Sequence, residues 1–408
     1  MTSSSPDFAR GPLADTTPQT DFYRPIRCIL GLPIDAATVN QAVTIIEQAA
    51  SARRRILVST PNLNFLVSCL ADEPFRDSVI FSDLSIVDGQ PLVWAGRLSG
   101  AAIPERVAGA TVFERLRQKS AGSITVYFFG GPEGAAAQAM RNMNQTPSGL
   151  RCVGACSPGF GSVAELSSAQ VIDDINGSGA QFLVVALSAQ KGQAWILHNL
   201  ARLKVPVISH LGAVVNLVAE TISRAPPLVQ RWHGEWLWRI KEEPLLWRRY
   251  FNDGTAFLQL IATRLLPCAA CQCWARLDRR HQRPATLAMQ RTLQASMLTF
   301  SGTWHEADLQ PLRAAFTELA KLPGDIELDL KDVTFVDSAT LGLFLLLYGH
   351  QRRQQHKLVF RHVSAGLRRL FALHCVGYLL QDAQPDGQTA AASTGLTKDE
   401  RRDRVDKQ

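Results

Sequence analysis

Short apolar runs alternate with helix-length amphipathic segments between Arg27 and about Ile208. An example of the helical kind follows Asp35, a residue that can cap a helix, where Val39, Val43 and Ile46 recur at helical spacing. The apolar runs predict buried strands at Ile56–Val58, Leu84–Val87, Thr125–Phe129, Arg151–Ala155, Gln181–Leu187 and Val205–Ile208. This alternation predicts an α/β fold with a Rossmann-like, mostly parallel sheet covered by helices on both faces. In such a sheet, ligands bind beyond the carboxyl ends of the strands.

The pattern changes twice after this sheet. Ala213–Pro267 is helical in character, and a second, smaller α/β unit follows a basic linker. In this unit we expect strands at Ile326–Leu330 and Leu358–Arg361 and helices at Thr340–Gln351 and Ala365–Leu373. The predicted segments are a disordered leader (1–22), an α/β core (23–222), a helical appendage (223–276), a linker (277–285), the small α/β domain (286–382) and a disordered tail (383–408).

Positive charge and tryptophan gather in the predicted appendage. The net charge of +7 is modest for 408 residues, but Arg224–Arg283 contains 11 Lys/Arg against 5 Asp/Glu and five of the eight Trp. Cations and indoles together suit a membrane interface, where they meet lipid phosphates and headgroups. A basic patch also suits nucleic acid, and an amphipathic subdomain with a Trp core would show the same pattern.

No segment predicts a secretory signal or a membrane-spanning helix. The first 21 residues lack an apolar stretch, and the most apolar later segment, Ala256–Ala275, is interrupted by polar residues and by Pro267. We therefore expect membrane contact to be peripheral. The eight Cys form no disulfide framework, which suits a reducing cytoplasm. Cys268, Cys271 and Cys273 lack a second pair at zinc spacing, so we expect no metal and no other cofactor.

Asp88 is the sharpest candidate for catalysis. It ends the apolar run Leu84–Val87 and precedes a glycine, so its carboxylate is expected at the ligand edge, where it can accept a proton from an attacking hydroxyl. An Asp at this point can equally cap the helix that begins near Gln90. Thr60 and Asn62 end the neighbouring strand and could hydrogen-bond a sugar, although Thr-Pro-Asn is also an ordinary turn.

A glycine-rich turn and the arginines of the appendage are candidates for binding a diphosphate. Gly130 and Gly131 follow a strand and open a helix, an arrangement that presents backbone N–H groups to phosphate. The turn lacks the Gly-x-Gly-x-x-Gly spacing of dinucleotide sites, and the chain contains no Asp-x-Asp triplet to hold a divalent ion on a nucleotide diphosphate. Cationic side chains would then neutralise a leaving diphosphate, and the segment Arg224–Arg249 supplies them.

Residues from about Cys28 to Leu266 resemble the WecG/TagA/CpsF glycosyltransferase family. The matching stretches are Thr60-Pro61-Asn62, Val87-Asp88-Gly89 with Trp94 following, Pro104-Glu105-Arg106-Val107-Ala108-Gly109, Phe129-Gly130-Gly131, Ser157-Pro158-Gly159-Phe160-Gly161, Arg224-Ala225-Pro226, Glu235-Trp236-Leu237-Trp238-Arg239, Glu243-Pro244 and Arg248-Arg249-Tyr250. Their number and order over about 240 residues make chance similarity a poor explanation.

The resemblance implies an inverting, metal-independent transferase. It would move an N-acetylmannosamine-type or related sugar from a UDP donor to a polyprenyl-diphosphate-linked sugar, in the synthesis of a bacterial exopolysaccharide or other cell-surface polysaccharide. Asp88 would be the catalytic base, with Thr60 and Asn62 in the same pocket. The implied substrate-binding residues are Arg106, Gly109, Gly130, Gly131, Gln190, Lys191, Arg224, Arg239 and Arg248. The appendage arginines would close over the diphosphate and help the protein sit on the cytoplasmic face of the membrane; nucleic acid is not an expected partner.

Two positions in one loop depart from the family pattern, and so does Thr111, where an Asp is common. The family usually has Gly-x-Pro-x-Gln-Glu after the fifth strand, whereas Gly192 and Gln193 stand at the Gln and Glu positions here. A polar pair near the donor pocket is therefore lost. One alternative is a catalytically weakened homologue that acts as a regulatory or scaffold protein. Another is an NAD(P)-dependent oxidoreductase, which rests on the α/β alternation alone and lacks the glycine motif.

The unit from about Thr286 to Leu380 resembles a STAS domain, the fold of sulfate transporters and anti-sigma-factor antagonists. The resemblance rests on the run Val333-Thr334-Phe335-Val336-Asp337-Ser338-Ala339-Thr340-Leu341-Gly342, with Asp337 and Ser338 as the signature pair. It implies that the helix after this turn carries a surface for a protein partner. In antagonists the next residue is usually a phosphorylated Ser, but Ala339 has no hydroxyl to modify. We therefore expect a docking module without the usual phosphate control.

Overall fold

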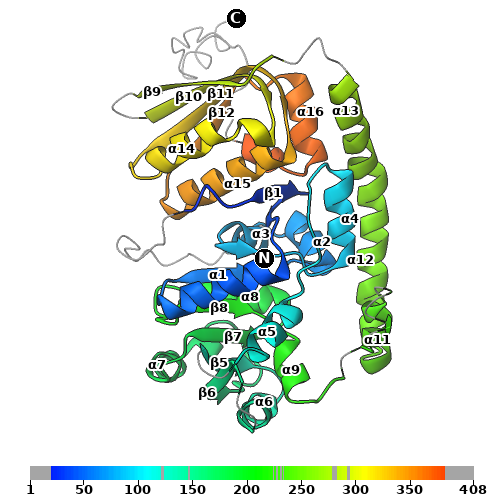
Figure 1. Ribbon diagram of the computed structural model, residues 1–408, viewed down its shortest axis with the longest axis vertical. Helices are drawn as coiled ribbons and strands as arrows, with labels where there is room; N and C mark the ends of the chain where they lie inside the picture. The colour runs from blue at the N-terminus through cyan, green and yellow to red at the C-terminus, as the bar shows by residue number, and fades with distance from the viewer. Residues whose placement is uncertain are drawn as a thin grey trace, which may run out of the picture.

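The computed structural model describes residues 20–120, 124–145, 148–223, 225–226, 228–229, 232, 234–277, 283–291 and 295–381. A large parallel sheet and a smaller mixed sheet lie at opposite ends of the molecule, with a two-stranded hairpin between them (Figure 1). A long helix runs along one side and reaches from the large sheet to the small domain (Figure 1).

The large sheet confirms the predicted α/β core. Its strands are β3 (Ile56–Ser59), β4 (Leu84–Ser85), β5 (Ile124–Gly130), β6 (Leu150–Cys156), β7 (Phe182–Ala186) and β8 (Val207–His210), in the spatial order β4-β3-β8-β7-β5-β6. All neighbouring strands are parallel. The strands show apolar runs because helices cover both faces: Val58 packs with α1 (Val39–Ser51) on one face, and Leu57 packs with α8 (Ala189–Asn199) on the other.

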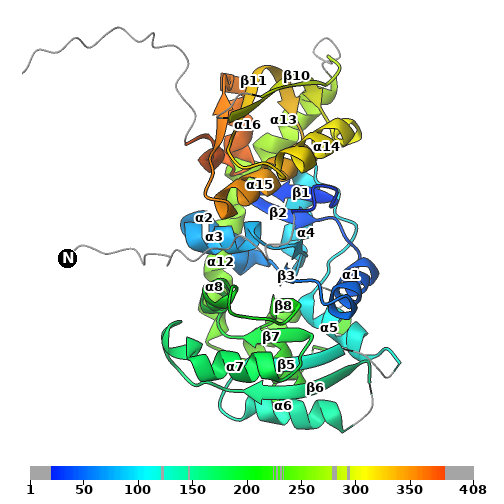
Figure 2. The ribbon, with the colours of Figure 1, turned by 90° about the vertical axis from the view of Figure 1, so that its left-hand side faces the viewer.

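The remaining helices of the core surround this sheet. They are α2 (Leu63–Ala71), α3 (Glu73–Ile80), α4 (Gln90–Leu98), α5 (Gly109–Arg117), α6 (Ala135–Asn144), α7 (Ala169–Gly177) and α9 (Val214–Val218). Figure 2 shows α6 and α7 at the end of the molecule farthest from the small domain. The loops beyond the carboxyl ends of the strands, where ligands bind in such a sheet, come from several separate parts of the chain.

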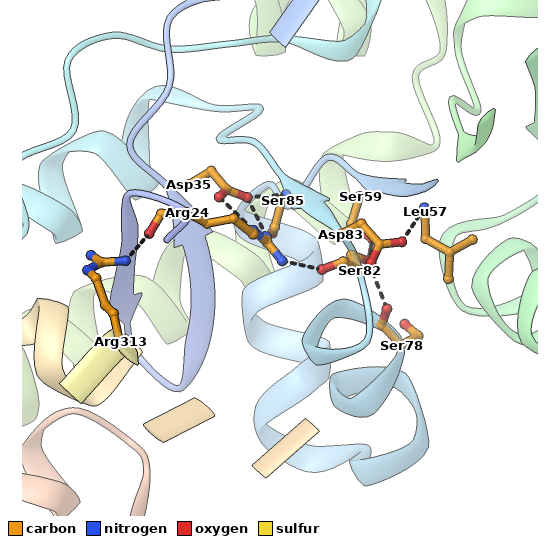
Figure 3. A network of polar contacts seen from close by, with 9 residues as sticks. All are labelled: Arg24, Asp35, Leu57, Ser59, Ser78, Ser82, Asp83, Ser85 and Arg313. Carbon is orange, nitrogen blue, oxygen red and sulfur yellow. Dashed lines mark hydrogen bonds and ion pairs between the residues drawn. The ribbon is translucent and has the colours of Figure 1, made fainter. Parts of the chain in front are cut away.

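Asp35 does not cap α1, contrary to the prediction. Thr38 is the N-cap and forms a capping box with Gln41. Asp35 instead ends β2 (Leu32–Asp35), where its Oδ2 accepts from Arg24 Nη2 at 2.6 Å and from the Ser85 amide at 2.7 Å. Figure 3 shows this network, in which Arg24 also donates to the Ser82 carbonyl at 2.9 Å. The carboxylate ties the hairpin to strand β4 of the core.

The small domain contains more strands than the sequence predicted. Its four-stranded sheet has the order β12-β11-β10-β9, from β9 (Thr286–Arg291), β10 (Ala295–Trp304), β11 (Asp325–Val336) and β12 (Leu358–Arg361). Helices α14 (Gln310–Leu319), α15 (Ser338–Arg353) and α16 (Ala365–Leu373) pack on it. Strands β9 and β10 and helix α14 were not predicted, although Leu298, Phe300 and Trp304 alternate with polar residues in β10, and Leu312, Phe316 and Leu319 recur at helical spacing in α14.

Helix α15 of the small domain packs directly against the hairpin of β1 (Ile26–Ile29) and β2. Phe22, Ile26 and Cys28 belong to the same buried cluster as the apolar residues of the small domain. A Cβ at Gly342 would lie 3.0 Å from Ile26 Cγ2, so the absence of a side chain permits this close approach. Phe22, the last residue of the predicted leader, is thus part of a hydrophobic core, and the two domains share buried surface.

The appendage consists of α11 (Glu235–Glu242), α12 (Leu246–Leu260), a π-helical turn (Ile261–Leu265) and α13 (Leu266–Leu277). The helix is interrupted near Pro244, but it continues without interruption through Pro267. A proline removes one backbone donor and crowds the preceding turn, and the wider π-helical turn just before Pro267 accommodates both effects.

The continuous helix changes the expectation that no segment of the chain could form a membrane-spanning helix. The helix Leu246–Trp274 is 29 residues long and contains an 18-residue window with a mean hydropathy of 1.3, which is long and apolar enough to cross a membrane by length and composition. One side of it packs on protein, since Phe257, Leu265 and Cys268 are buried.

Candidate active site

Asp88 lies where the chain leaves strand β4, in a loop that is held from two sides. Its amide donates to the Pro61 carbonyl at 2.8 Å, and the Val107 amide donates to the Val87 carbonyl at 2.8 Å. Its Oδ2 accepts from the Gly109 amide, the first residue of α5, at 3.3 Å. The carboxylate does not cap α4, because the N-cap there is the neighbouring glycine and makes no side-chain bond. The bond from Gly109 places the Asp88 carboxylate at the N-terminal end of α5, and the positive end of the helix dipole there favours the ionised form of the carboxyl.

Thr60 and Asn62 lie beside Asp88, as expected from their positions at the end of β3. A Cβ at Gly109 would lie 3.0 Å from Thr60 Cγ2, and a Cβ at Gly89 would lie 3.7 Å from Asn62 Cβ. Asn62 also caps α2, since its Oδ1 accepts from the Phe65 amide at 3.1 Å. The loops that carry Thr60, Asp88 and Gly109 thus converge, although the side-chain oxygen of Asn62 already accepts a hydrogen bond from α2.

Burial raises the pKa of the Asp88 carboxyl to about 6, and the Gly109 amide and the Arg106 guanidinium oppose this increase. Glu235 also raises this pKa through its charge, and Arg239 lowers it. A carboxyl with a pKa near neutrality suits a general base, because it is ionised at physiological pH yet still basic enough to take a proton.

Two guanidiniums act on this carboxyl through their charges, one from the core and one from the appendage. Arg106 Nη1 and Nη2 donate to the two oxygens of Glu235 at 2.7 and 3.0 Å, which joins the core to α11. Arg239, one turn further along α11, donates to Glu243 at 3.2 Å. The sequence predicted both arginines as substrate-binding residues, but it gave no signal that glutamates of the appendage would pair with them.

Of the two other predicted arginines, only Arg248 lies among the described residues. Arg248 is exposed, with its guanidinium 5.7 Å from the ring of the adjacent Trp247. Arg224 lies outside the described residues.

The glycine turn after β5 has the strained backbone that glycine permits. Gly130 and Gly131 have φ values of 104° and 85°, and a Cβ at Gly130 would lie 2.6 Å from the Ala186 carbonyl oxygen. The Gly131 amide donates to that same carbonyl at 2.8 Å, so it is already hydrogen-bonded. Of the two amides predicted to face a phosphate, one is thus committed to β7.

Gln190 and Lys191 make contacts within the protein. Gln190 Nε2 donates to Asp72 at 3.4 Å, and Lys191 Nζ donates to the Gly161 carbonyl at 2.8 Å. Among the described residues, neither side chain makes a polar contact with Asp88.

The departure at Gly192 and Gln193 has a structural counterpart that the sequence did not reveal. A Cβ at Gly192 would lie 2.3 Å from Cδ2 of His210, so the imidazole occupies the space that a side chain would need. Burial lowers the pKa of His210, and the neutral ring donates from Nε2 to the Leu187 carbonyl at 2.9 Å. Gln193 is buried and donates to Ser59 at 3.0 Å. Only the three-dimensional contact identifies His210, at the end of β8, as a residue of the ligand edge.

Comparison with known proteins agrees with this geometry. Residues 27–269 match the glycosyl transferase WecG/TagA/CpsF family. A relative from Bacillus spizizenii, N-acetylglucosaminyldiphosphoundecaprenol N-acetyl-beta-D-mannosaminyltransferase, is 25% identical over 200 residues, which are 48% of this chain and 74% of the relative. A match to a crystal structure of an SsGBP mutation variant covers 64% of this chain and 88% of the chain in that structure, with 10% identity and a TM-score of 0.19. This similarity is too distant to indicate a shared fold.

The small domain matches a different family. Residues 287–381 match the Mlab, STAS domain, which confirms the second resemblance seen in the sequence. Asp337 of the signature pair caps α15 by accepting from the Thr340 amide at 2.8 Å, and Ser338 is buried against the hairpin.

Proposed function

Because the chain belongs to the WecG/TagA/CpsF family of glycosyl transferases, we propose that it is an inverting enzyme that acts without a metal ion. It moves a hexose or N-acetylhexosamine of the N-acetylmannosamine type from a UDP-sugar to a polyprenyl-diphosphate-linked sugar. The product serves a bacterial exopolysaccharide or other cell-surface polysaccharide. The name of the Bacillus spizizenii relative, an N-acetylmannosaminyltransferase acting on a diphosphoundecaprenol-linked sugar, supports this choice of sugar and acceptor.

The observation that carries the proposal is the partly buried carboxyl of Asp88, whose pKa is raised to about 6 and which lies between loops of two neighbouring strands. In the proposed reaction this carboxylate takes the proton of the acceptor hydroxyl while the hydroxyl oxygen attacks the anomeric carbon. The bond from that carbon to the diphosphate oxygen breaks, and its electron pair leaves with UDP. Attack from the side opposite the leaving group inverts the anomeric centre.

Guanidinium groups take the role that a divalent ion plays in other transferases. Arg106 and Arg239 lower the pKa of Asp88 through their charges, which supports a role for both guanidiniums toward a diphosphate bound beside that carboxyl. Planar guanidiniums bind phosphate oxygens in pairs and can therefore stabilise the charge that develops on the leaving group.

We also propose that the protein is cytoplasmic and lies on the inner face of the cell membrane, held there by its appendage. Trp236, Trp247 and Trp274 are 48%, 51% and 74% exposed along α11–α13. Exposed indoles next to basic side chains favour the headgroup layer. The opposite side of the same helix packs on the protein, so the helix lies along the surface in this proposal and does not span the bilayer.

The proposal is tested with the full-length protein, vesicles that contain an N-acetylglucosaminyl polyprenyl diphosphate, and a set of UDP-hexosamines. We expect UDP release with transfer of one sugar, unchanged by a chelator of divalent ions. Asp88→Asn should lower turnover by about 10²- to 10⁴-fold. Asp173→Asn is the matched control, since Asp173 is an exposed carboxylate of α7. Full turnover by a folded Asp88→Asn protein would remove the catalytic assignment.

The contact of Gly192 with His210 supports a second candidate function, a weakened homologue with a regulatory or scaffold role. The family's usual Gln side chain cannot be present there, because the imidazole fills its space. This candidate predicts that nucleotide sugars bind without turnover across all donors and acceptors in the same screen.

A further inference from the structure

The carboxylate of Glu235 accepts hydrogen bonds from the guanidinium of Arg106, on which the proposed function depends. Both terminal nitrogens of Arg106 donate to Glu235, at 2.7 and 3.0 Å, in the paired geometry that a guanidinium also uses for phosphate oxygens. The Arg106 and Glu235 side chains are 20% and 32% exposed. A phosphate group therefore cannot bind the same edge of Arg106 while Glu235 remains in place.

The second guanidinium near Asp88 is engaged in a related way. Arg239 Nη2 donates to Glu243 at 3.2 Å, four residues further along the chain, whereas its Nε is buried and has no hydrogen-bond partner among the described residues. Arg239 thus has unused donor capacity, and an additional acceptor would relieve an unfavourable buried donor.

The charges of this cluster favour replacement of a glutamate by the diphosphate over binding of the diphosphate with both glutamates in place. Asp88, Glu235 and Glu243 supply three carboxyls against the two guanidiniums of Arg106 and Arg239. A diphosphate brings at least two more negative charges, which the cluster could not neutralise with every carboxylate still in place. Departure of one glutamate would reduce this excess of negative charge by one.

We propose that Glu235 is a place-holder for the donor diphosphate: its carboxylate occupies Arg106 in the free protein, and the diphosphate displaces it on binding. This inference rests on the proposed function, because it assumes that the donor carries a diphosphate to Arg106. Glu235 acts as a positioning residue. It keeps Arg106 aligned and the appendage over Asp88 until the substrate arrives, at the expense of donor affinity.

The alternative is that Glu235 has only a structural role, in which its ion pair with Arg106 holds α11 on the core. The two roles predict opposite results for Glu235→Gln, which keeps the shape and one acceptor oxygen but removes the charge. If the role is only structural, loss of the ion pair loosens the appendage and weakens donor binding. A place-holder that has lost its charge competes less well with the diphosphate, so binding becomes tighter.

The test is the Kd for UDP, measured by calorimetry on the full-length protein at low ionic strength, together with donor KM and kcat. For Glu235→Gln we expect the Kd for UDP to fall about five- to tenfold and the donor KM to fall with it, with kcat changed less. Glu242→Gln is the matched control, because Glu242 lies on the same helix and its carboxylate bonds to Ser223 instead of to Arg106. That variant should bind UDP as the wild type does.

Two further measurements separate this inference from a structural effect and from the proposed function. Removal of the Glu235 charge should move the acid limb of the pH profile of kcat/KM, which reports the free enzyme, to lower pH, because that charge helps to raise the pKa of Asp88. In Arg106→Gln, the additional Glu235→Gln change should no longer tighten UDP binding. An unchanged or weaker affinity in a Glu235→Gln protein that melts like the wild type would overturn the inference alone. Failure of the wild type to bind UDP would overturn the proposed function as well.

Discussion

The hydroxyl of Ser338 donates a 2.9 Å hydrogen bond to the carbonyl oxygen of Cys28. Ser338 belongs to the signature turn of the STAS domain, and Cys28 belongs to strand β1, 310 residues earlier in the chain. Nearby, Arg313 donates to the Arg24 carbonyl at 2.9 Å, and Arg352 pairs with Asp77 of α3 at 2.8 Å. The face on which the STAS resemblance places a partner is thus covered by the chain's own hairpin. A protein partner of this domain would have to bind another face or displace the hairpin.

A charge placed in this contact should destabilise the whole protein. Ser338→Asp would bury a carboxylate against the Cys28 carbonyl, and we expect it to lower the free energy of unfolding by about 3 kcal/mol or more. Ser364→Asp is the control, because Ser364 is an exposed helix N-cap in the same domain, where Asp serves equally well. Urea unfolding of the full-length protein measures both. Equal stability of the two variants would show that the turn is not held by the hairpin.

The stability of the protein should depend on the ionisation of Asp88. Because its pKa is raised in the folded protein, Asp88 favours folding while protonated, and this contribution is lost as the pH rises through about 6. Asp88→Asn should therefore raise the free energy of unfolding at pH 8 by about 1 to 2 kcal/mol, and by much less at pH 4. The comparison requires urea titrations at both pH values. A stabilisation of equal size at pH 4 and pH 8 would be inconsistent with a raised pKa.

Turnover should have an acid limb set by the same carboxyl. A general base acts only when ionised, so kcat should rise tenfold per pH unit below about 6 and then level off, as expected from the raised pKa of Asp88. The pH dependence of kcat with saturating donor and acceptor measures this. An acid limb centred near pH 4 would mean that the burial of Asp88 does not persist in the complex.

A side chain at position 192 should conflict with His210. Gly192→Ala would bring Cβ to 2.3 Å from the imidazole, and we expect a loss of about 1 to 3 kcal/mol of stability from overpacking. His210→Ala in the same protein should relieve much of that loss, because it empties the contested space. The coupling energy from the double-mutant cycle is the measurement. Additive effects of the two changes would argue against the contact.

The exposed face of the appendage should determine binding to vesicles. Replacement of Trp247 and Trp274 by Ser should weaken sedimentation with anionic phospholipid vesicles by about tenfold or more, since each indole contributes favourably at the headgroup layer. Leu322→Ser, which alters an exposed apolar side chain of the small domain, should leave binding unchanged. Equal binding by all three proteins would contradict the proposed localisation.

The sequence was sufficient where local pattern and burial coincide. Strands buried on both faces must be apolar along their length, so runs such as Ile56–Val58 were visible without any knowledge of their neighbours. The end of such a run marks the ligand edge of a parallel sheet, which is why Asp88, Thr60 and Asn62 could be grouped before the fold was known. The prediction nevertheless missed one local signal, because Thr38 and Gln41 have the spacing of a capping box, and Thr38, not Asp35, caps α1.

Only the tertiary structure decided which distant residues meet. Glu235 pairs with Arg106 across 129 positions, and His210 fills the space beside Gly192, but neither partner is marked by spacing or period. The hairpin likewise joins the STAS core through Phe22, which lay in a segment without helical or strand periodicity. The physical reason is that periodicity reports which face of an element is buried, whereas the identity of its neighbour depends on chain topology and packing.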